Sequence, residues 1–243
     1  MFPIRDNIPS TFKPYAARTI IALNAVVFLF ELGLSQREMV QLFYSFGVVP
    51  ARYFHPAWAE MVGFPGSDFL PFLTHMFLHS GFLHFIANMW ILWVFADNVE
   101  DVMGSVRFAL FYVCCGLVAL AGHAAFNSGS TVPVVGASGA IAGVMGAYLL
   151  LYPRALVLTL VPVFIIPFFL DLPAVLFLGL WFLIQVFSGL ASNIAERGAA
   201  GVAWWAHAFG FIGGMALLFA FKSEKRLEQT KKRLRSMNNF FFS

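Results

Sequence analysis

Two polar side chains in strongly apolar surroundings have the chemistry of a catalytic pair. Ser138 lies in "VVGASGAIAGVMGAYLLLY" (134–152), a stretch with one serine, four glycines and no charge. His207 lies in "AWWAHAFGFIGGM" (203–215). A serine hydroxyl becomes an effective nucleophile when an imidazole can take its proton. The pair predicts nucleophilic catalysis if the fold brings the two side chains together.

Glycines in both stretches suggest how the side chains could meet. Each stretch carries a Gly-x-x-x-Gly pair, a spacing that lets two membrane helices pack closely. The pairs are Gly139 with Gly143 and Gly210 with Gly214. Two helices that run in the same direction and touch along these faces would place Ser138 and His207 within hydrogen-bond range. A small-residue packing face with a structural histidine is the alternative interpretation.

Ser138 is expected in the first turn of its helix. The first amides of a helix have no intrahelical partner and lie at the positive end of the helix dipole. An oxyanion formed at this serine would meet those donors. Gly136 and Gly139 flank the serine and allow other backbone to approach closely. A serine that only caps the helix remains the alternative.

A third polar group lies in "HMFLHSGFLHFIANMW" (75–90). His84 and Asn88 are four residues apart, so they share a helix face and both can donate hydrogen bonds to an oxyanion. His75 and His79 have the same spacing and fit a structural polar role. A zinc site is the rival for such a His-x-x-x-His pair, but no third ligand or H-E-x-x-H pattern accompanies it. We expect no metal and no cofactor.

The composition predicts a membrane protein. Hydrophobic residues make up 60% of the chain and charged residues 11%, whereas an ordinary soluble domain carries about 25% charge. About 20 apolar residues cross a bilayer core. The expected fold is an all-α polytopic bundle of six transmembrane helices, at 18–35, 76–97, 106–125, 137–152, 172–190 and 202–221.

Residues 155–170 are also apolar enough to span. Pro162 and Pro167 break this stretch, which predicts an interfacial or re-entrant connector, with a seventh span as the alternative. Asp171 and Pro173 suit the N-cap and first turn of the helix that follows.

The charges predict the orientation, because Lys and Arg accumulate on the cytoplasmic side. With six spans both termini share a side that holds twelve of the 15 Lys and Arg residues: Arg5, Lys13, Arg18, Arg107, Arg154, Lys222, Lys225, Arg226, Lys231, Lys232, Arg233 and Arg235. The other side has only three. Both termini are therefore expected in the cytoplasm, with segments 1–17 and 222–243 flanking a membrane domain at 18–221.

Other features are assigned more simply. Residues 36–75 form a long outer loop, rich in aromatic residues, Gly and Pro, that should pack on itself or dip into the outer leaflet. The basic tail suits anionic lipid rather than nucleic acid, since no nucleic-acid-binding module accompanies it. Cys114 and Cys115 are adjacent and suit packing. Neither the oligomeric state nor the particular substrate can be read from these patterns.

Three of these motifs together resemble one family. "GASG", "HAFGFIGG" and "HMFLHSGFLHFIANMW" look like the motifs of the rhomboid intramembrane serine proteases, and the resemblance covers about residues 18–221. It implies Ser138 as nucleophile, His207 as general base, and an oxyanion hole made by His84, Asn88 and the Ser138 amide. The implied substrates are membrane-spanning segments of other proteins, cut near the outer face of what is expected to be a bacterial plasma membrane.

Two positions depart from the pattern of some members. "FLPFLTH" stands where a Trp-Arg pair would anchor the first loop, and Ala142 stands where a tyrosine would stack on the histidine. Trp204 or Trp205 is expected to orient the histidine instead. A non-catalytic relative that binds transmembrane segments is the main alternative function. A small-solute transporter is a second one, supported only by the broken stretch at 155–170.

Overall fold

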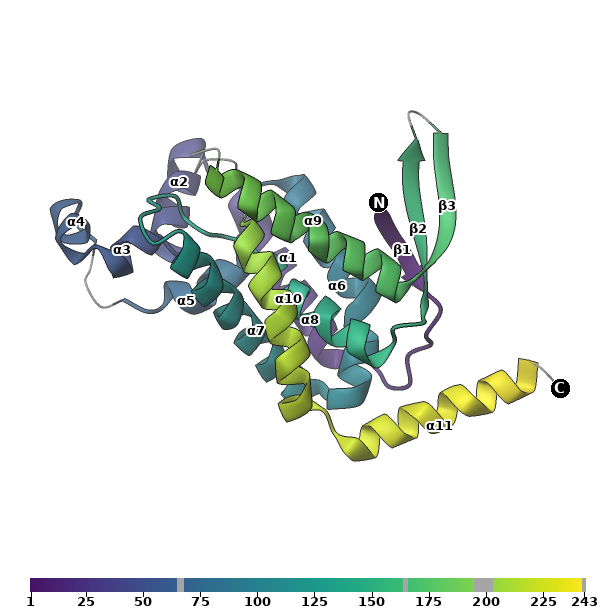
Figure 1. The fold of residues 1–243 in the computed structure, drawn as a ribbon. Helices are drawn as coiled ribbons and strands as arrows, with labels where there is room; N and C mark the ends of the chain where they lie inside the picture. The colour runs from purple at the N-terminus through teal and green to yellow at the C-terminus, as the bar shows by residue number, and fades with distance from the viewer. Residues whose placement is uncertain (65–67, 164–165, 195–202, 242–243) are drawn as a thin grey trace.

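The computed structural model describes residues 1–64, 68–163, 166–194 and 203–241, and shows a helical bundle with a small sheet at one end (Figure 1). Six helices build the bundle. They are α1 (Tyr15–Leu32), α6 (Phe82–Met103), α7 (Ser105–Phe126), α8 (Ser138–Leu151), α9 (Ala174–Ile194) and α10 (Trp204–Phe221). In the described part of the chain, all but α8 are long and apolar enough to cross a membrane. The predicted membrane bundle is thus confirmed, with α8 as a shorter apolar helix.

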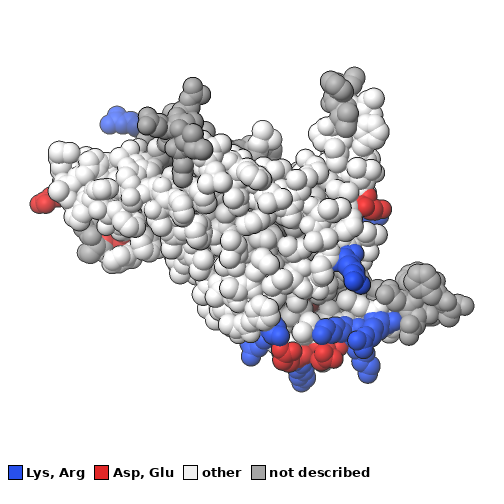
Figure 2. All heavy atoms as spheres, in the orientation of Figure 1, with Lys and Arg blue, Asp and Glu red and all other residues white. Residues whose placement is uncertain are grey.

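The surfaces of these helices suit lipid. Large apolar side chains are exposed along α1 and α9, for example Leu29 and Phe187. Soluble monomers rarely expose such continuous apolar surface, and large patches of this kind mark membrane or protein contacts. Figure 2 shows most of the charged side chains gathered at the end where α11 lies, below a broad uncharged belt.

The helix boundaries correct two predictions. The second span was expected at 76–97, but α6 begins at Phe82 and ends at Met103. It begins later than expected because the backbone is extended at Leu78 and Gly81. The expected cap at Asp171 is also wrong. Asp171 pairs with Leu158 in a sheet, and α9 begins only at Ala174, after Pro173.

A three-stranded antiparallel sheet is the main feature that the all-α expectation lacks. Its order is β1 (Phe2–Asp6), β2 (Leu156–Val163) and β3 (Ile166–Pro173). The described residues of the stretch 155–170 therefore form neither a helix nor a seventh helical span. Pro162 and Pro167 stand opposite each other across the β2–β3 pair. Proline breaks helices but is tolerated near the end of a hairpin, where fewer ladder hydrogen bonds are lost.

The described residues of the predicted outer loop (36–75) fold on themselves. The loop contains the short helices α2 (Gln36–Phe46), α3 (Pro50–Phe54), α4 (Pro56–Met61) and α5 (Pro71–Thr74), followed by the 3₁₀ turn η1 (His75–Phe77). Arg52 is buried in this loop and forms an ion pair with Asp68 at 3.3 Å. The Tyr53 hydroxyl donates to the Asp68 carbonyl at 2.9 Å. These bonds tie α3, in the middle of the loop, to the segment just before α5.

Both terminal segments meet at the C-terminal end of α6. Glu100 accepts the backbone amides of Ala16 and Ala17 at 3.0 and 2.8 Å, so a carboxylate from another helix caps the start of α1. Such acceptors satisfy amides that a helix leaves free at its N-terminus. The terminal helix α11 (Glu224–Phe241) is held there too, since Arg226 Nε donates to the Asp101 carbonyl at 2.9 Å.

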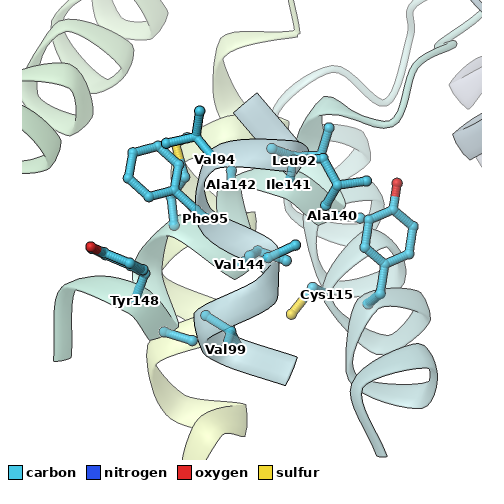
Figure 3. Packing of buried hydrophobic residues seen from close by; sticks show 14 of the residues in the cluster. Leu92, Val94, Phe95, Val99, Cys115, Ala140, Ile141, Ala142, Val144 and Tyr148 are labelled. Carbon is cyan, nitrogen blue, oxygen red and sulfur yellow. The ribbon is translucent and has the colours of Figure 1, made fainter. Parts of the chain in front are cut away.

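The core lies where α6, α7 and α8 meet (Figure 3). Leu92, Phe95 and Val99 of α6 and Val144 of α8 are completely buried there. Cys115 of α7 joins this cluster as a free thiol, in keeping with the predicted packing role. The dense apolar packing fixes the position of α8, the helix that begins with Ser138.

The buried carboxyl of Asp6 predicts a pH effect on stability. Asp6 accepts a hydrogen bond from the Tyr148 hydroxyl, and burial raises the pKa of Asp6 from 3.8 to about 6. A carboxyl whose pKa is raised in the fold gives its full stabilisation below pH 3.8, and this is lost as the pH rises through about 6. Asp6→Asn keeps an acceptor oxygen without the charge. It should raise the thermal midpoint at pH 8, with a gain of up to about 3 kcal/mol, but not at pH 4.

The measurement is thermal unfolding in detergent at both pH values. Asp171→Asn, at an exposed position on β3, is the control and should leave the difference between the two pH values unchanged. Equal midpoints for wild type and Asp6→Asn at pH 8 would contradict the raised pKa assigned to Asp6.

Candidate active site

Ser138 is the first residue of α8, and the segment before it is fixed at two points. Val134 and Val48 exchange backbone hydrogen bonds of 2.7 and 3.1 Å, which ties the segment to the outer loop. The Gly136 amide donates to the His75 carbonyl at 2.8 Å. The first turn of α8 has no side-chain cap among the described residues, so the amide at Ser138 remains open to a ligand.

Helices α8 and α10 touch through their glycines. A Cβ atom added to Gly210 would overlap the carbonyl oxygen of Gly139, and one added to Gly214 would overlap that of Gly143. The opposite side of α8 is as tight, because a Cβ on Gly139 would lie 2.6 Å from the Ala119 Cβ of α7. Backbone contact of this kind sets the distance between Ser138 and His207.

Ser138 and His207 form a hydrogen bond across these two helices. Ser138 Oγ lies 2.8 Å from His207 Nε2. Both side chains are half-buried. A separation of this size is in the range required between a nucleophile and its general base.

His84 lies in the first turn of α6, against Gly136 of the segment before Ser138. A Cβ added to Gly136 would lie 2.8 Å from His84 Cε1, 2.9 Å from His84 Nε2 and 3.8 Å from Ser138 Oγ. Gly136 also has φ of 125°, a conformation that side chains disfavour. Glycine at this position therefore leaves room for the His84 imidazole beside the segment that leads into Ser138.

The protonation of His84 follows from its neighbour. The Ser80 backbone amide lies 3.3 Å from His84 Nδ1, and the Ser80 hydroxyl lies 3.0 Å from the same atom. A backbone N–H can only donate, so Nδ1 of the neutral ring accepts and the proton is on Nε2. His84 thus presents an N–H donor on the side of the ring that faces Gly136.

Asn88 lies one turn further along α6, on the same face as His84. Its Nδ2 atom donates to the His84 carbonyl at 2.9 Å, and the side chain is buried. An amide nitrogen has two hydrogens, so one donor remains for another acceptor.

His75 and His79 do not lie on α6, so their predicted i,i+4 relationship on that helix is wrong. His75 belongs to the turn η1, where Nδ1 bonds the Pro71 carbonyl at 3.0 Å. His79 lies in the extended link, and its amide donates to the Glu31 carboxylate at 3.1 Å. Burial lowers the pKa of each histidine to about 4, so both rings are neutral at pH 7. Both residues position the site through their backbone.

Gln185 of α9 is a site residue that the sequence analysis did not find. Its Oε1 atom lies 2.8 Å from His207 Nδ1, and the side chain is buried. The available signal was a lone amide in the apolar stretch 174–187, since polar groups within spans tend to be functional.

Of the two tryptophans expected to orient His207, Trp204 lies beside the imidazole and Trp205 stacks on another ring. The Trp204 ring stands edge-on to the imidazole, with centroids 6.4 Å apart, whereas Trp205 stacks on Phe126 at 4.1 Å. A third indole, Trp181 of α9, lies 5.9 Å from the imidazole. Ala142 is fully buried in the helix core.

Metal ligands do not gather here. Within the residues that the structure describes, no group of three or more His, Cys, Asp or Glu side chains is arranged to hold a metal ion.

Comparison with known proteins identifies the family. Residues 66–224, more than half of the chain, match the rhomboid domain. The chain belongs to the rhomboid family. With its apolar helices, this rhomboid is an integral membrane protein.

Its relatives come from bacteria and eukaryotes. The Bacillus subtilis (strain 168) protein named "Putative rhomboid protease YdcA" is 30% identical over 155 residues, which are 61% of this chain and 69% of the relative. The mouse "Presenilin-associated rhomboid-like protein, mitochondrial" is 30% identical over 149 residues, 60% of this chain but only 35% of the mouse protein. The Arabidopsis thaliana "RHOMBOID-like protein 6, mitochondrial" is 35% identical over 92 residues, 38% of this chain and 29% of the relative.

The glycine contact between α8 and α10 gives a prediction for stability. Gly214→Ala places a methyl group against the Gly143 backbone, so the helices must separate, and we expect a loss of about 1–3 kcal/mol. Gly179→Ala on α9 is the matched control, because a Cβ there meets nothing within 4 Å. Thermal unfolding in detergent measures both. A Gly214→Ala variant as stable as Gly179→Ala would show that the contact tolerates separation.

Proposed function

We propose that this rhomboid is an intramembrane serine endopeptidase that hydrolyses peptide bonds in or near transmembrane segments of other proteins. The observation that carries the proposal is the 2.8 Å contact between Ser138 Oγ and His207 Nε2 at the open start of a helix. Family membership supports it, because the resemblance noted above is to serine proteases of the membrane. The geometry of the site and the family membership therefore support the same reaction.

The proposed reaction has two steps. Ser138 Oγ attacks the carbonyl carbon of the scissile bond while His207 Nε2 accepts the hydroxyl proton. His207 then gives this proton to the departing amine, and an ester at Ser138 remains. His207 then deprotonates a water molecule that attacks the ester carbonyl, and it passes this proton to Ser138 Oγ as the acid product leaves. No metal or cofactor is needed for either step.

Three donors would stabilise the oxyanion of each tetrahedral intermediate. The Ser138 amide is open at the start of α8, and the N–H of His84 faces the same region. The free hydrogen of the Asn88 amide is the third, and the α8 dipole adds to them. Donors fixed in advance stabilise developing charge without reorganisation, and one such donor is worth about 10²–10³ in kcat.

The proposal includes an orientation. Ser138 lies at the same end of the bundle as the outer loop, and both terminal segments meet at the opposite end, near α6 Glu100. The Lys and Arg distribution supports a cytoplasmic position for that end. We place the enzyme in the bacterial plasma membrane, with segments 1–17 and 222–243 cytoplasmic and the site opening to the outer side. Lipid and transmembrane substrates are the expected partners.

The alternative function is a non-catalytic rhomboid that binds transmembrane segments. Such a protein would need neither the contact between Ser138 and His207 nor a proton donor at His84. A fluorophosphonate probe separates the two functions, because it labels only a serine that a base has activated. Purified wild type in detergent should be labelled, whereas Ser138→Ala and His207→Ala should not.

Matched controls test the site rather than the residue type. Ser45→Ala and His55→Ala change exposed residues of the outer loop and should label like wild type. No labelling of folded wild type would favour the binder. Labelling of Ser138→Ala would place the reactive serine elsewhere.

The oxyanion role of His84 gives a second prediction. His84→Phe keeps a ring of similar size but removes the donor that faces Gly136, so kcat for a transmembrane substrate should fall about 10²–10³-fold. KM should change little, because the donor acts on charge that develops only in the transition state. His55→Phe is the control. A rise in KM at constant kcat would instead assign His84 to substrate binding.

A further inference from the structure

Gln185 is a buried polar side chain that contacts the proposed dyad but has no part in its two steps. It lies on α9, with 5% of its surface exposed, and contacts the imidazole of His207 on the side away from the serine. Burying an amide is unfavourable unless its hydrogen bonds are made. Both ends of this amide have partners, and these partners determine how it is oriented.

The orientation of the amide follows from the Trp181 carbonyl. Gln185 Nε2 lies 3.1 Å from that oxygen, which can only accept. Turning the amide over would bring two oxygens together at Trp181, so the nitrogen must face Trp181. The oxygen of Gln185 is then the atom that faces His207 Nδ1, at 2.8 Å.

An acceptor at this position selects one form of the neutral imidazole. Oε1 of Gln185 has no hydrogen to give, so His207 Nδ1 must carry the proton in their hydrogen bond. The other nitrogen, Nε2, is then left with a free lone pair directed at the Ser138 hydroxyl, 2.8 Å away. The opposite tautomer would point an N–H at the serine and could not accept its proton.

We propose that Gln185 is a positioning residue that holds His207 in the Nδ1–H tautomer and so prepares Nε2 to act as the base. This inference rests on the proposed function for its effect on rate. The tautomer itself is independent of that function. Gln185 bonds the imidazole nitrogen that faces away from the serine, so it acts through His207.

This positioning role of Gln185 makes the dyad depend on a third helix. Ser138 and His207 are held by the glycine contact between α8 and α10, whereas Gln185 comes from α9, the least buried of the five long apolar helices. The imidazole therefore has the correct tautomer only when α9 is seated against α10.

The direct test is ¹⁵N NMR of histidine-labelled protein in detergent, with His207→Asn used to assign the His207 signals. Wild type should show a protonated Nδ1 and an unprotonated Nε2 at neutral pH. In Gln185→Met, which has similar length and no acceptor, the two tautomers should mix. Gln185→Glu keeps an acceptor oxygen and should keep the Nδ1–H form. A wild-type ring protonated on Nε2 would overturn the proposal, and this outcome needs no variant to fold.

Kinetics provide the second readout. Gln185→Met should lower kcat at least about tenfold, the factor expected for one lost hydrogen bond, with KM nearly unchanged. Phe187→Leu, at an exposed position on the same helix, controls for disturbance of α9 and should match wild type. A Gln185→Met variant with unchanged tautomer and unchanged kcat would overturn the proposal. If folded wild type takes no fluorophosphonate, the proposed function fails, while the NMR result still decides the role of Gln185.

Discussion

Backbone contact between α8 and α10 is the constraint on which the rest of the site depends. Gly210 and Gly214 lie directly on the carbonyls of Gly139 and Gly143, where no side chain fits. Apolar side chains gain little by packing on one another rather than on lipid, so close approach and dispersion contacts must hold these helices together. The same approach brings Ser138 to 2.8 Å from His207, so one interface serves both stability and geometry.

Polar groups elsewhere are used to fix the ends of elements. Glu100 caps α1 from α6, Glu31 accepts the His79 amide, and the His75 carbonyl accepts the Gly136 amide. Each bond joins segments far apart in the sequence. Buried polar groups need partners. Here the bonds to these partners hold the start of α1 and the chain that leads into α6 and α8 in place. The first turn of α8, which begins with the serine, has no side-chain cap.

Much of the site was predictable because its signals are local. A serine among glycines, a histidine before a Gly-x-x-x-Gly pair and a His84–Asn88 spacing all lie within short stretches. Span boundaries were harder, since hydropathy cannot distinguish the extended link at Leu78–Gly81 from the helix that follows. The sheet was missed for a similar reason, because an apolar stretch with two prolines suits a hairpin or a connector equally. Gln185 was missed because its partner depends on how α9 is rotated against α10, which no spacing within α9 encodes.

One imidazole of this site bonds the serine and another lies against Gly136, two residues before it, and their surroundings hold them in opposite forms. The Ser80 amide makes His84 Nδ1 an acceptor, so His84 has its proton on Nε2 and can donate. Gln185 makes His207 Nδ1 a donor, so His207 has a lone pair on Nε2 and can accept. In the proposed reaction this acceptor and this donor supply the two functions that acyl transfer requires, removal of the serine proton and stabilisation of the oxyanion. Identical side chains thus take different roles because one neighbouring group at each ring can only donate or only accept.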